Sequence, residues 1–526
     1  MRFKNLIYAS AFSTLMLAAG ACKKGKFDIN SNPDDITDVS VSPSVILPAA
    51  LQSTSRLVAA DWNWLSMWMG HWARNGSYQP QTDIETYSFT NEFQVRVWND
   101  LYANTTNYNI MQKKAAETGA GFYEAIARIM KAHNFQLLVD IYNNVPYSEA
   151  FRGTALATPK YDKGIDIYKD LFRQLDTALT LLKTASAIEE AKNPDIATSD
   201  LVYHGDTESW MKFANTLKLR MIVHLHNGIA ANQTVQEIDI AAELAKISPE
   251  GFIGEGESAH LNPGFVSTKP NPYYREYVQT ESGSQSNDII RASEYAIEYY
   301  KGNSDPRIGR FYVAPSTGHL GNRLGNPSST DANGFNPYSG DRLSTVRGPG
   351  LLPAGAASRA WILTSVESLF LQAEAAHRGI LTGVNAKDLL ISAVSESFVW
   401  LGLTSAQSAT YLAANAGWPD VDYDAPSRIA GQPGGGLYTI LSQKWFALNS
   451  LAPYEVWTDY RRTDFVLGAA VSYTPGPPIS IAPGTTATTI PRRLLYPQNE
   501  YNYNASNVGK EGAINIFSSK VFWDLN

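Results

Sequence analysis

The stretch GDTESWMKFANTLKLRMIVHLHN, residues 205–227, has the periodicity of a single amphipathic helix. Its large apolar side chains recur every three or four residues and therefore share one helix face; they are Trp210, Phe213, Leu217, Met221 and Leu225. Asp206 or Thr207 can cap the amino-terminal end, and Asn227-Gly228 ends the pattern. The stretch therefore predicts a helix that packs one face into a core.

Similar spacing dominates the rest of the chain. It is found at residues 62–72, 124–142 and 366–379, and further helices are predicted at 95–117, 162–185, 233–246, 287–301, 384–402 and 435–450. Within the first of these segments, Trp64, Trp68, His71 and Trp72 share a stripe, which favours core packing over contact with a ligand.

Long stretches without helical spacing separate these segments. They cover residues 251–286, 311–357 and 467–497, and the first two are rich in Tyr, Asn, Gly and Ser. Loops of this length are usually functional or disordered. The sequence therefore predicts a mainly α fold of paired helices with little β structure, in which long irregular loops form a binding face.

Cys22 is the single cysteine in 526 residues, and it follows a secretory leader. Arg2 and Lys4 precede a mainly apolar run, and small residues lead directly into Cys22. The pattern predicts a signal peptide over residues 1–21, too short to be a spanning helix. Ordinary secretory cleavage would leave a plain thiol, whereas a lipobox would acylate Cys22. We favour the lipoprotein, with a tether over residues 22–41 and a binding domain over 42–526.

Composition narrows the class of ligand. The net charge of −7 argues against a nucleic-acid partner, which would usually select a basic chain. Charged residues are only 18% of the chain, while aromatic residues are 11%. Such a surface suits neutral polar ligands that stack on rings and accept hydrogen bonds.

Catalytic and metal-binding motifs are absent from the sequence. There is no HExxH, no GxxxxGK[ST] and no GxSxG. His224 and His226 are two residues apart and point to different faces of a helix, so they cannot hold one metal together. We predict no cofactor and no metal site. Glu276 and Glu281 could serve a glycoside hydrolase only at a suitable separation, so we interpret them as surface charges.

Candidate ligand contacts come from the predicted loops. NPYYREY, residues 271–277, lies in a proline-punctuated loop in which its tyrosines have no helix face to fill, so they contact either a ligand or the loop itself. Trp62 lies off the tryptophan stripe and is predicted to be exposed. The ligand-binding residues predicted in this way are Trp62, Tyr273, Tyr274, Tyr277, Asn336, Tyr338 and Asp341.

Eight segments in a fixed order resemble the SusD/RagB family of nutrient-binding outer-membrane lipoproteins. They include LLVDIYNNVPYSEAF (137–151), in which Asn143 replaces a usual Gly, and WMKFANTLKLRM (210–221), in which Thr216 replaces a usual Ser. The other six segments are residues 27–51, 159–179, 305–311, 370–379, 456–465 and 490–497.

This resemblance implies tetratricopeptide-like helix pairs and a surface-exposed, lipid-anchored protein of the outer membrane. It implies a TonB-dependent SusC-type transporter as partner and oligosaccharide capture without catalysis. An oligopeptide ligand, a surface-anchored helical glycoside hydrolase and a structural lid without a ligand remain alternatives. The polar motif residues are predicted to hold helix ends together by charged hydrogen bonds; they are Asn215, Arg220, Asp305, Arg307, Asp459, Arg461 and Arg462.

Overall fold

The computed structural model describes residues 41–185, 191–228, 233–327, 336–428, 434–464 and 476–526. The chain divides into the units Met1–Ser42 and Pro43–Asn526. The predicted leader, Cys22 and nearly all of the predicted tether therefore lie outside the described residues, as does part of the predicted loop over 467–497.

Helices dominate the unit Pro43–Asn526, as predicted. The longer helices are α2 (Pro43–Ala60), α5 (Val95–Thr118), α6 (Gly121–Tyr142), α7 (Gly164–Ala185), α9 (Thr207–His224), α12 (Glu294–Gly302), α14 (Ser365–His377), α15 (Ala386–Trp400), α16 (Ser405–Ala414), α17 (Gly436–Ala447) and α18 (Pro453–Thr463). The shorter helices are α3 (Asn63–Trp68), α4 (Thr82–Glu85), α8 (Ile196–Ser199), α10 (Ile240–Leu244), α11 (Pro272–Tyr277), α13 (Ile308–Phe311), α19 (Gln498–Tyr503) and α20 (Ala505–Val508).

The described strands are short and form two-stranded antiparallel sheets. The pairs are β1 (Trp72–Arg74) with β7 (Ile290–Ala292), β2 (Val145–Pro146) with β3 (Tyr161–Asp162), β4 (His226–Asn227) with β5 (Gln233–Thr234), and β6 (Ala259–His260) with β8 (Trp361–Leu363). In the β1–β7 pair, Ala73 lies opposite Arg291.

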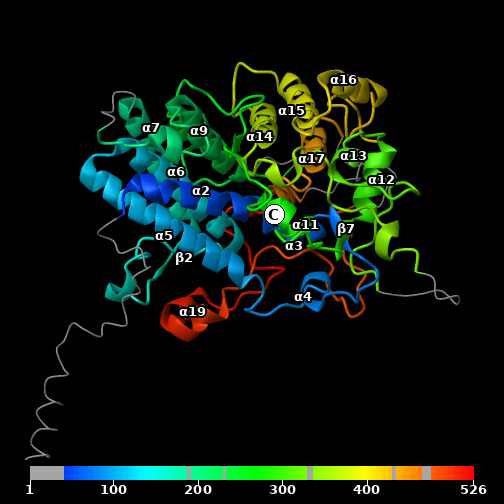
Figure 1. The fold of residues 1–526 in the computed structure, drawn as a ribbon, viewed down its shortest axis with the longest axis horizontal. Helices are drawn as coiled ribbons and strands as arrows, with labels where there is room; N and C mark the ends of the chain where they lie inside the picture. Colours follow the sequence, from blue (N-terminus) through cyan, green and yellow to red (C-terminus); the bar gives the residue numbers. More distant parts are fainter. Residues whose placement is uncertain (1–40, 186–190, 229–232, 328–335, 429–433, 465–475) are drawn as a thin grey trace, which may run out of the picture. The chain divides into compact units, whose positions relative to one another are not determined.

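Neighbouring helices pack as pairs. α5 packs against α6 and α6 against α7, while α14 packs against α15 in the carboxy-terminal half. Gly119 allows the tight connection between α5 and α6, since its positive φ of 70° closes α5 and few other residues adopt that angle without strain. Figure 1 shows α5, α6 and α7 in blue to blue-green and α14 and α15 in yellow, with mid-chain segments such as α11 and α12 in green.

An aromatic cluster forms part of the core next to α3. Trp64 and Trp68 meet edge to face with ring centroids 4.8 Å apart, and Trp457 of α18 lies 5.7 Å from Trp64. Phe93 stacks on Trp68 at 5.9 Å. The predicted core role of the tryptophan stripe is confirmed for Trp64 and Trp68, which are both fully buried.

Some predicted boundaries are wrong, and the reasons are physical. The helix predicted over 62–72 ends at Trp68, because Trp72 begins β1 and pairs with β7. The same pairing removes the first half of the helix predicted over 287–301, and β5 replaces the start of the one predicted over 233–246. Helix α2 was not predicted, because Pro48 lies inside it and proline normally interrupts helices.

Buried charges join α6, α9, α14, α17 and α18. Arg220 of α9 donates to Glu367 of α14 at 2.9 Å and to Gln136 of α6 at 2.8 Å. His224, one turn further along α9, contacts Glu455 of α18 at 2.9 Å and Asp140 of α6 at 3.2 Å. Burial opposes the charge on His224, but Glu455 and Asp140 outweigh it and raise the pKa of His224.

The same network continues through α17 and α18. Lys444 donates to Glu455 at 2.8 Å and contacts Asp459 at 2.9 Å, and Arg462 donates both Nη atoms to Glu374 at 2.6 Å. Arg462 also contacts Asp459, at 2.5 Å. With Arg378, which donates to Glu374, the network holds five cationic and five acidic side chains when His224 is protonated. This balance matters because an uncompensated buried charge is costly.

The remaining polar motif residues lie in separate buried contacts. Arg307 pairs with Asp305 at 2.6 Å and donates to Ser397 of α15 and Gln443 of α17. Asn215 donates to the carbonyl oxygen of Gly251, which fixes the chain after α10. Arg461 lies 3.6 Å from the Trp457 ring centroid and donates to the carbonyl oxygen of Arg492.

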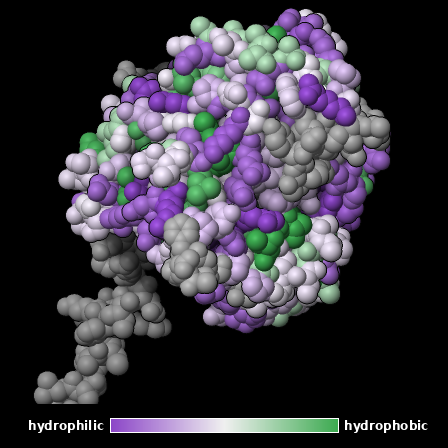
Figure 2. Space-filling view, turned by 90° about the vertical axis from the view of Figure 1, so that its right-hand side faces the viewer, coloured by the Kyte–Doolittle hydropathy of each residue, from purple (hydrophilic) through white to green (hydrophobic). Residues whose placement is uncertain are grey.

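Hydrophilic residues cover most of the face drawn in Figure 2, where apolar residues form small separate groups. In the described part of the chain, no helix combines the length and apolar character needed to cross a membrane.

Arg462→Met tests the buried network. We expect the free energy of unfolding to fall by about 3–5 kcal/mol, because Glu374 and Asp459 lose a cation that no solvent replaces. Urea denaturation followed by circular dichroism would measure the loss. The control is Arg173→Met. The Arg173 side chain is 72% exposed and pairs with Asp170, so its loss should change the free energy of unfolding by less than about 1 kcal/mol. Equal effects of the two changes would contradict this role for the network.

Candidate ligand-binding site

A polar pocket with a volume of about 640 Å³ lies between α2 and residues 265–286. This volume is within the range usual for small-molecule sites. The α2 side chains Ala49, Gln52, Ser53 and Arg56 line it with helical spacing on the face opposite the buried one, and the buried Ala60 borders it at the end of the helix. The amphipathic character of α2 therefore builds one wall of the pocket.

Four charged residues form a closed ring at one end of this wall. Arg56 donates to Asp61 at 2.9 Å and to Asp100 of α5 at 2.8 Å. Arg96, in the first turn of α5, forms ion pairs with the same two carboxylates, those of Asp61 and Asp100. Each charge in the ring thus lies between two of opposite sign, which fixes the side chains that border the pocket.

Asp61 is the most buried member of this ring. Its pKa is raised from the ordinary value of 3.8 to about 6. Burial is the main cause, and the charges of Asp100 and Glu276 add to it, while Arg56 and Arg96 oppose it. Asp61 in the pocket wall therefore becomes protonated as the pH falls from neutral to mildly acidic values.

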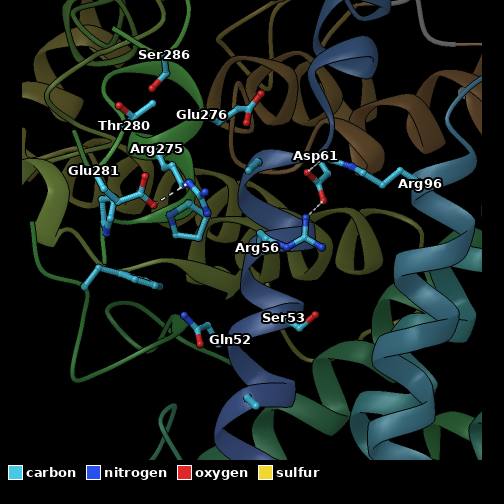
Figure 3. Close-up of a pocket in the computed structure, with 15 residues that line it drawn as sticks. Gln52, Ser53, Arg56, Asp61, Arg96, Arg275, Glu276, Thr280, Glu281 and Ser286 are labelled. Atoms are coloured by element: carbon cyan, nitrogen blue, oxygen red, sulfur yellow. Dashed lines mark hydrogen bonds and ion pairs between the residues drawn. The ribbon is translucent and has the colours of Figure 1, made fainter. Parts of the chain in front are cut away.

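The opposite wall consists of α11 and the chain that follows it. Asn271 caps α11 by accepting from the backbone of Tyr274, and Pro272 occupies its first turn. Arg275 pairs with Glu281 at 3.0 Å across a tight turn in which Thr280 donates to Ser284. Figure 3 shows this pair on one side of the pocket and Gln52 and Ser53 of α2 on the other.

Several polar groups at the pocket remain available for a ligand. Within the described ranges, the side chains of Gln52, Ser53 and Glu276 make no hydrogen bond or ion pair, although all three line the pocket. The buried hydroxyl of Ser286 likewise has no partner there. Amide, hydroxyl and carboxylate groups of this kind can bind the hydroxyl groups of a polar ligand.

Three of the predicted ligand contacts are buried in the core. Tyr273 and Tyr277 are one turn apart on α11, so they do have a helix face to fill, and their hydroxyls donate to the carbonyl oxygens of Val346 and Ala60. Trp62 is only 3% exposed and packs 5.6 Å from Tyr454. The predicted exposure of Trp62 is therefore wrong. For Tyr273 and Tyr277 the sequence left ligand contact and packing within the protein open, and the structure shows that both rings pack against the protein itself.

Asn336, Tyr338 and Asp341 lie together in a different loop bundle. The side chain of Asn336 donates to Gly76, and the carbonyl oxygen of Tyr338 accepts from the Gly76 amide at 2.7 Å. The side chain of Asn75 joins this loop to the chain at Asp288. Tyr338 is partly exposed and Asp341 is exposed, so both can reach a ligand.

None of the seven predicted contacts lines the polar pocket between α2 and residues 265–286, although some of their neighbours in the sequence do. Tyr274 is half-buried, and its hydroxyl donates to Gln279. Arg275 and Glu276, from the quoted motif at 271–277, do line the pocket. The contribution of α2 was missed, and the signal for it is the polar stripe Gln52, Ser53 and Arg56 opposite the apolar residues of that helix.

Comparisons with known proteins place the chain in a family. Residues 33–497 match the SusD-like family described as starch-binding and associating with the outer membrane, and the chain belongs to this family. A search of curated proteins found no match. Family membership supports a nutrient-binding role in association with the outer membrane.

Solved structures show the same fold. A chitin-binding SusD homologue from Flavobacterium johnsoniae has a TM-score of 0.69 at 22% identity, covering 92% of this chain and 99% of its own. SusD homologues from Bacteroides fragilis and Bacteroides uniformis have TM-scores of 0.68 and 0.66 at 18% and 21% identity. They cover 92% and 91% of this chain and 99% of their own.

Asp61→Asn tests the electrostatics of the pocket. The folded protein binds a proton at Asp61 that the unfolded chain lacks between about pH 4 and 6, so wild-type stability should rise, relative to the variant, as the pH falls. From pH 7 to pH 4.5 the gain should be about 2 kcal/mol. Chemical denaturation of both proteins at the two pH values measures it. A relative loss of wild-type stability on acidification would mean that Arg56 and Arg96 outweigh burial.

Proposed function

We propose that this protein is a non-catalytic, lipid-anchored protein of the cell surface that captures oligosaccharides and delivers them to a SusC-type, TonB-dependent transporter. The observation that carries the proposal is the polar pocket of about 640 Å³, whose walls expose unpaired hydrogen-bonding groups. Membership of a family described as starch-binding, and likeness to a chitin-binding homologue, support a sugar ligand.

The pocket offers a physical basis for sugar binding. Gln52, Ser53 and Glu276 can accept or donate to ligand hydroxyls without breaking a contact within the protein. Arg56 and Arg96 are already held by Asp61 and Asp100, so they form a rigid border. Such preorganisation reduces the entropy that binding costs.

The carboxylates in the pocket also raise the alternative of a glycoside hydrolase. Asp61, with its pKa near 6, resembles a general acid, and Glu276 lies close enough to influence it. However, both carboxylate oxygens of Asp61 are engaged by Arg56 and Arg96, which leaves neither free to protonate a glycosidic oxygen. Glu281 is likewise paired with Arg275. These contacts favour binding over hydrolysis.

Gln52→Ala and Glu276→Ala test the site. We expect roughly fivefold weaker sugar binding for Gln52→Ala and tenfold or greater for Glu276→Ala, because a charged acceptor makes the stronger hydrogen bond. Calorimetric titration with maltohexaose and chitohexaose measures affinity, and product analysis of the same mixtures detects cleavage.

The matched control is Glu117→Ala, an exposed glutamate at the far end of α5 that does not line the pocket. Tyr338→Ala tests the neighbouring loop bundle. If only Tyr338→Ala weakens binding, the ligand occupies that bundle and the pocket assignment fails. Release of reducing ends that Glu276→Ala abolishes would establish a hydrolase instead.

Cys22→Ser tests the anchor. The variant should leave the membrane pellet and appear in soluble fractions when the protein is expressed without a partner, because it lacks the thiol that carries the lipid. Fractionation followed by mass spectrometry of the amino-terminal peptide distinguishes the two forms. An unmodified Cys22 in the wild-type protein would eliminate the lipid anchor.

A further inference from the structure

A second pocket, of about 330 Å³, lies between residues 350–361 and the carboxy-terminal end of α15. It shares no lining residue with the polar pocket. Its volume is at the lower end of the range for ligand sites, which suits a ligand of one or two rings. Its function does not depend on the function proposed above.

A tryptophan pair forms the apolar part of this pocket. Trp361 is buried, and its indole nitrogen donates to the carbonyl oxygen of Leu451 at 2.9 Å. Trp400 meets Trp361 edge to face at 5.6 Å and remains partly exposed at the pocket. Because Trp361 is fixed, it holds the Trp400 ring as a platform. Leu351 and Pro353 add aliphatic surface beside it.

A single uncompensated cation lies among the lining residues. Arg359 is exposed, and its Nη1 lies 2.6 Å from Nε2 of His260. Burial and the charge of Arg359 lower the pKa of His260 to about 4, so at neutral pH the imidazole is neutral and accepts this hydrogen bond. No carboxylate among the described residues lies within ion-pair distance of Arg359. The pocket therefore combines an aromatic platform with one free positive charge.

We propose that this second pocket binds a six-membered ring that bears a carboxylate, with the ring stacked on Trp400 and the carboxylate paired with Arg359. A guanidinium suits this task because its planar donors match the two oxygens of a carboxylate. A hydrophobic ring face against an indole contributes the apolar part of the affinity. Two sources share this chemistry, namely a uronic acid residue of a glycan and an aromatic acid.

Saturation-transfer NMR with four small probes tests the proposal on the full chain. Methyl glucuronide and benzoate carry the carboxylate, while methyl glucoside and benzyl alcohol are their uncharged counterparts. We expect at least one carboxylate to bind roughly tenfold more tightly than its counterpart. Binding of methyl glucuronide would assign the site to an acidic sugar, and binding of benzoate alone would assign it to an aromatic acid.

Substitutions then locate the binding. Arg359→Gln should lower the affinity for the carboxylate probe tenfold or more. Trp400→Ala should also lower this affinity, and thermal melts check that the variant is folded. Arg152→Gln is the matched control, since it removes an exposed arginine that lines neither pocket. Unchanged binding by Arg359→Gln, equal binding of charged and uncharged probes, or loss of binding in Glu276→Ala would each overturn the proposal.

Discussion

The architecture depends on the need to compensate charges that lie away from water. Arg220, His224, Lys444 and Arg462 each meet carboxylates contributed by other helices, and none can leave its partners without exposing a charge to an apolar interior. These contacts specify how α6, α9, α14, α17 and α18 sit against one another. With the helices held in this way, the segments between them can be long and irregular without loosening the molecule.

Those irregular segments contribute to two pockets of different chemistry. Residues 265–286 and α2 form the walls of the polar pocket, which carry amide and hydroxyl groups and ion pairs. His260 and residues 350–361 border a smaller space with an indole platform. The two are joined structurally, because the side chain of Asn271 caps α11 and also donates to the carbonyl oxygens of Ser358 and Arg359. One buried asparagine thus supports both surfaces.

The sequence predicted the helical class well because apolar spacing reflects burial directly, as in the stripe Trp210 to Leu225. It failed where a distant partner decides the outcome. Nothing near Trp72 reveals its pairing with Ala292, and nothing near Tyr273 reveals that Trp72 and Trp361 enclose its ring. The site illustrates the same limit: part of the predicted loop over 251–286 does line the pocket, whereas the individual lining residues and the contribution of α2 required three-dimensional information.

The separation of network partners along the chain also constrains when the molecule can become folded. His224 and Glu455 are 231 residues apart, and Arg220 and Glu367 are 147 residues apart. Because α6 and α9 precede α18 by more than 200 residues, the contacts of His224 with Glu455 cannot form until the last fifth of the chain has been made. Contacts of such long range form slowly. The network therefore cannot be completed before α18 is present, although helix pairs nearer the amino terminus, such as α5 with α6, need no residue of α18.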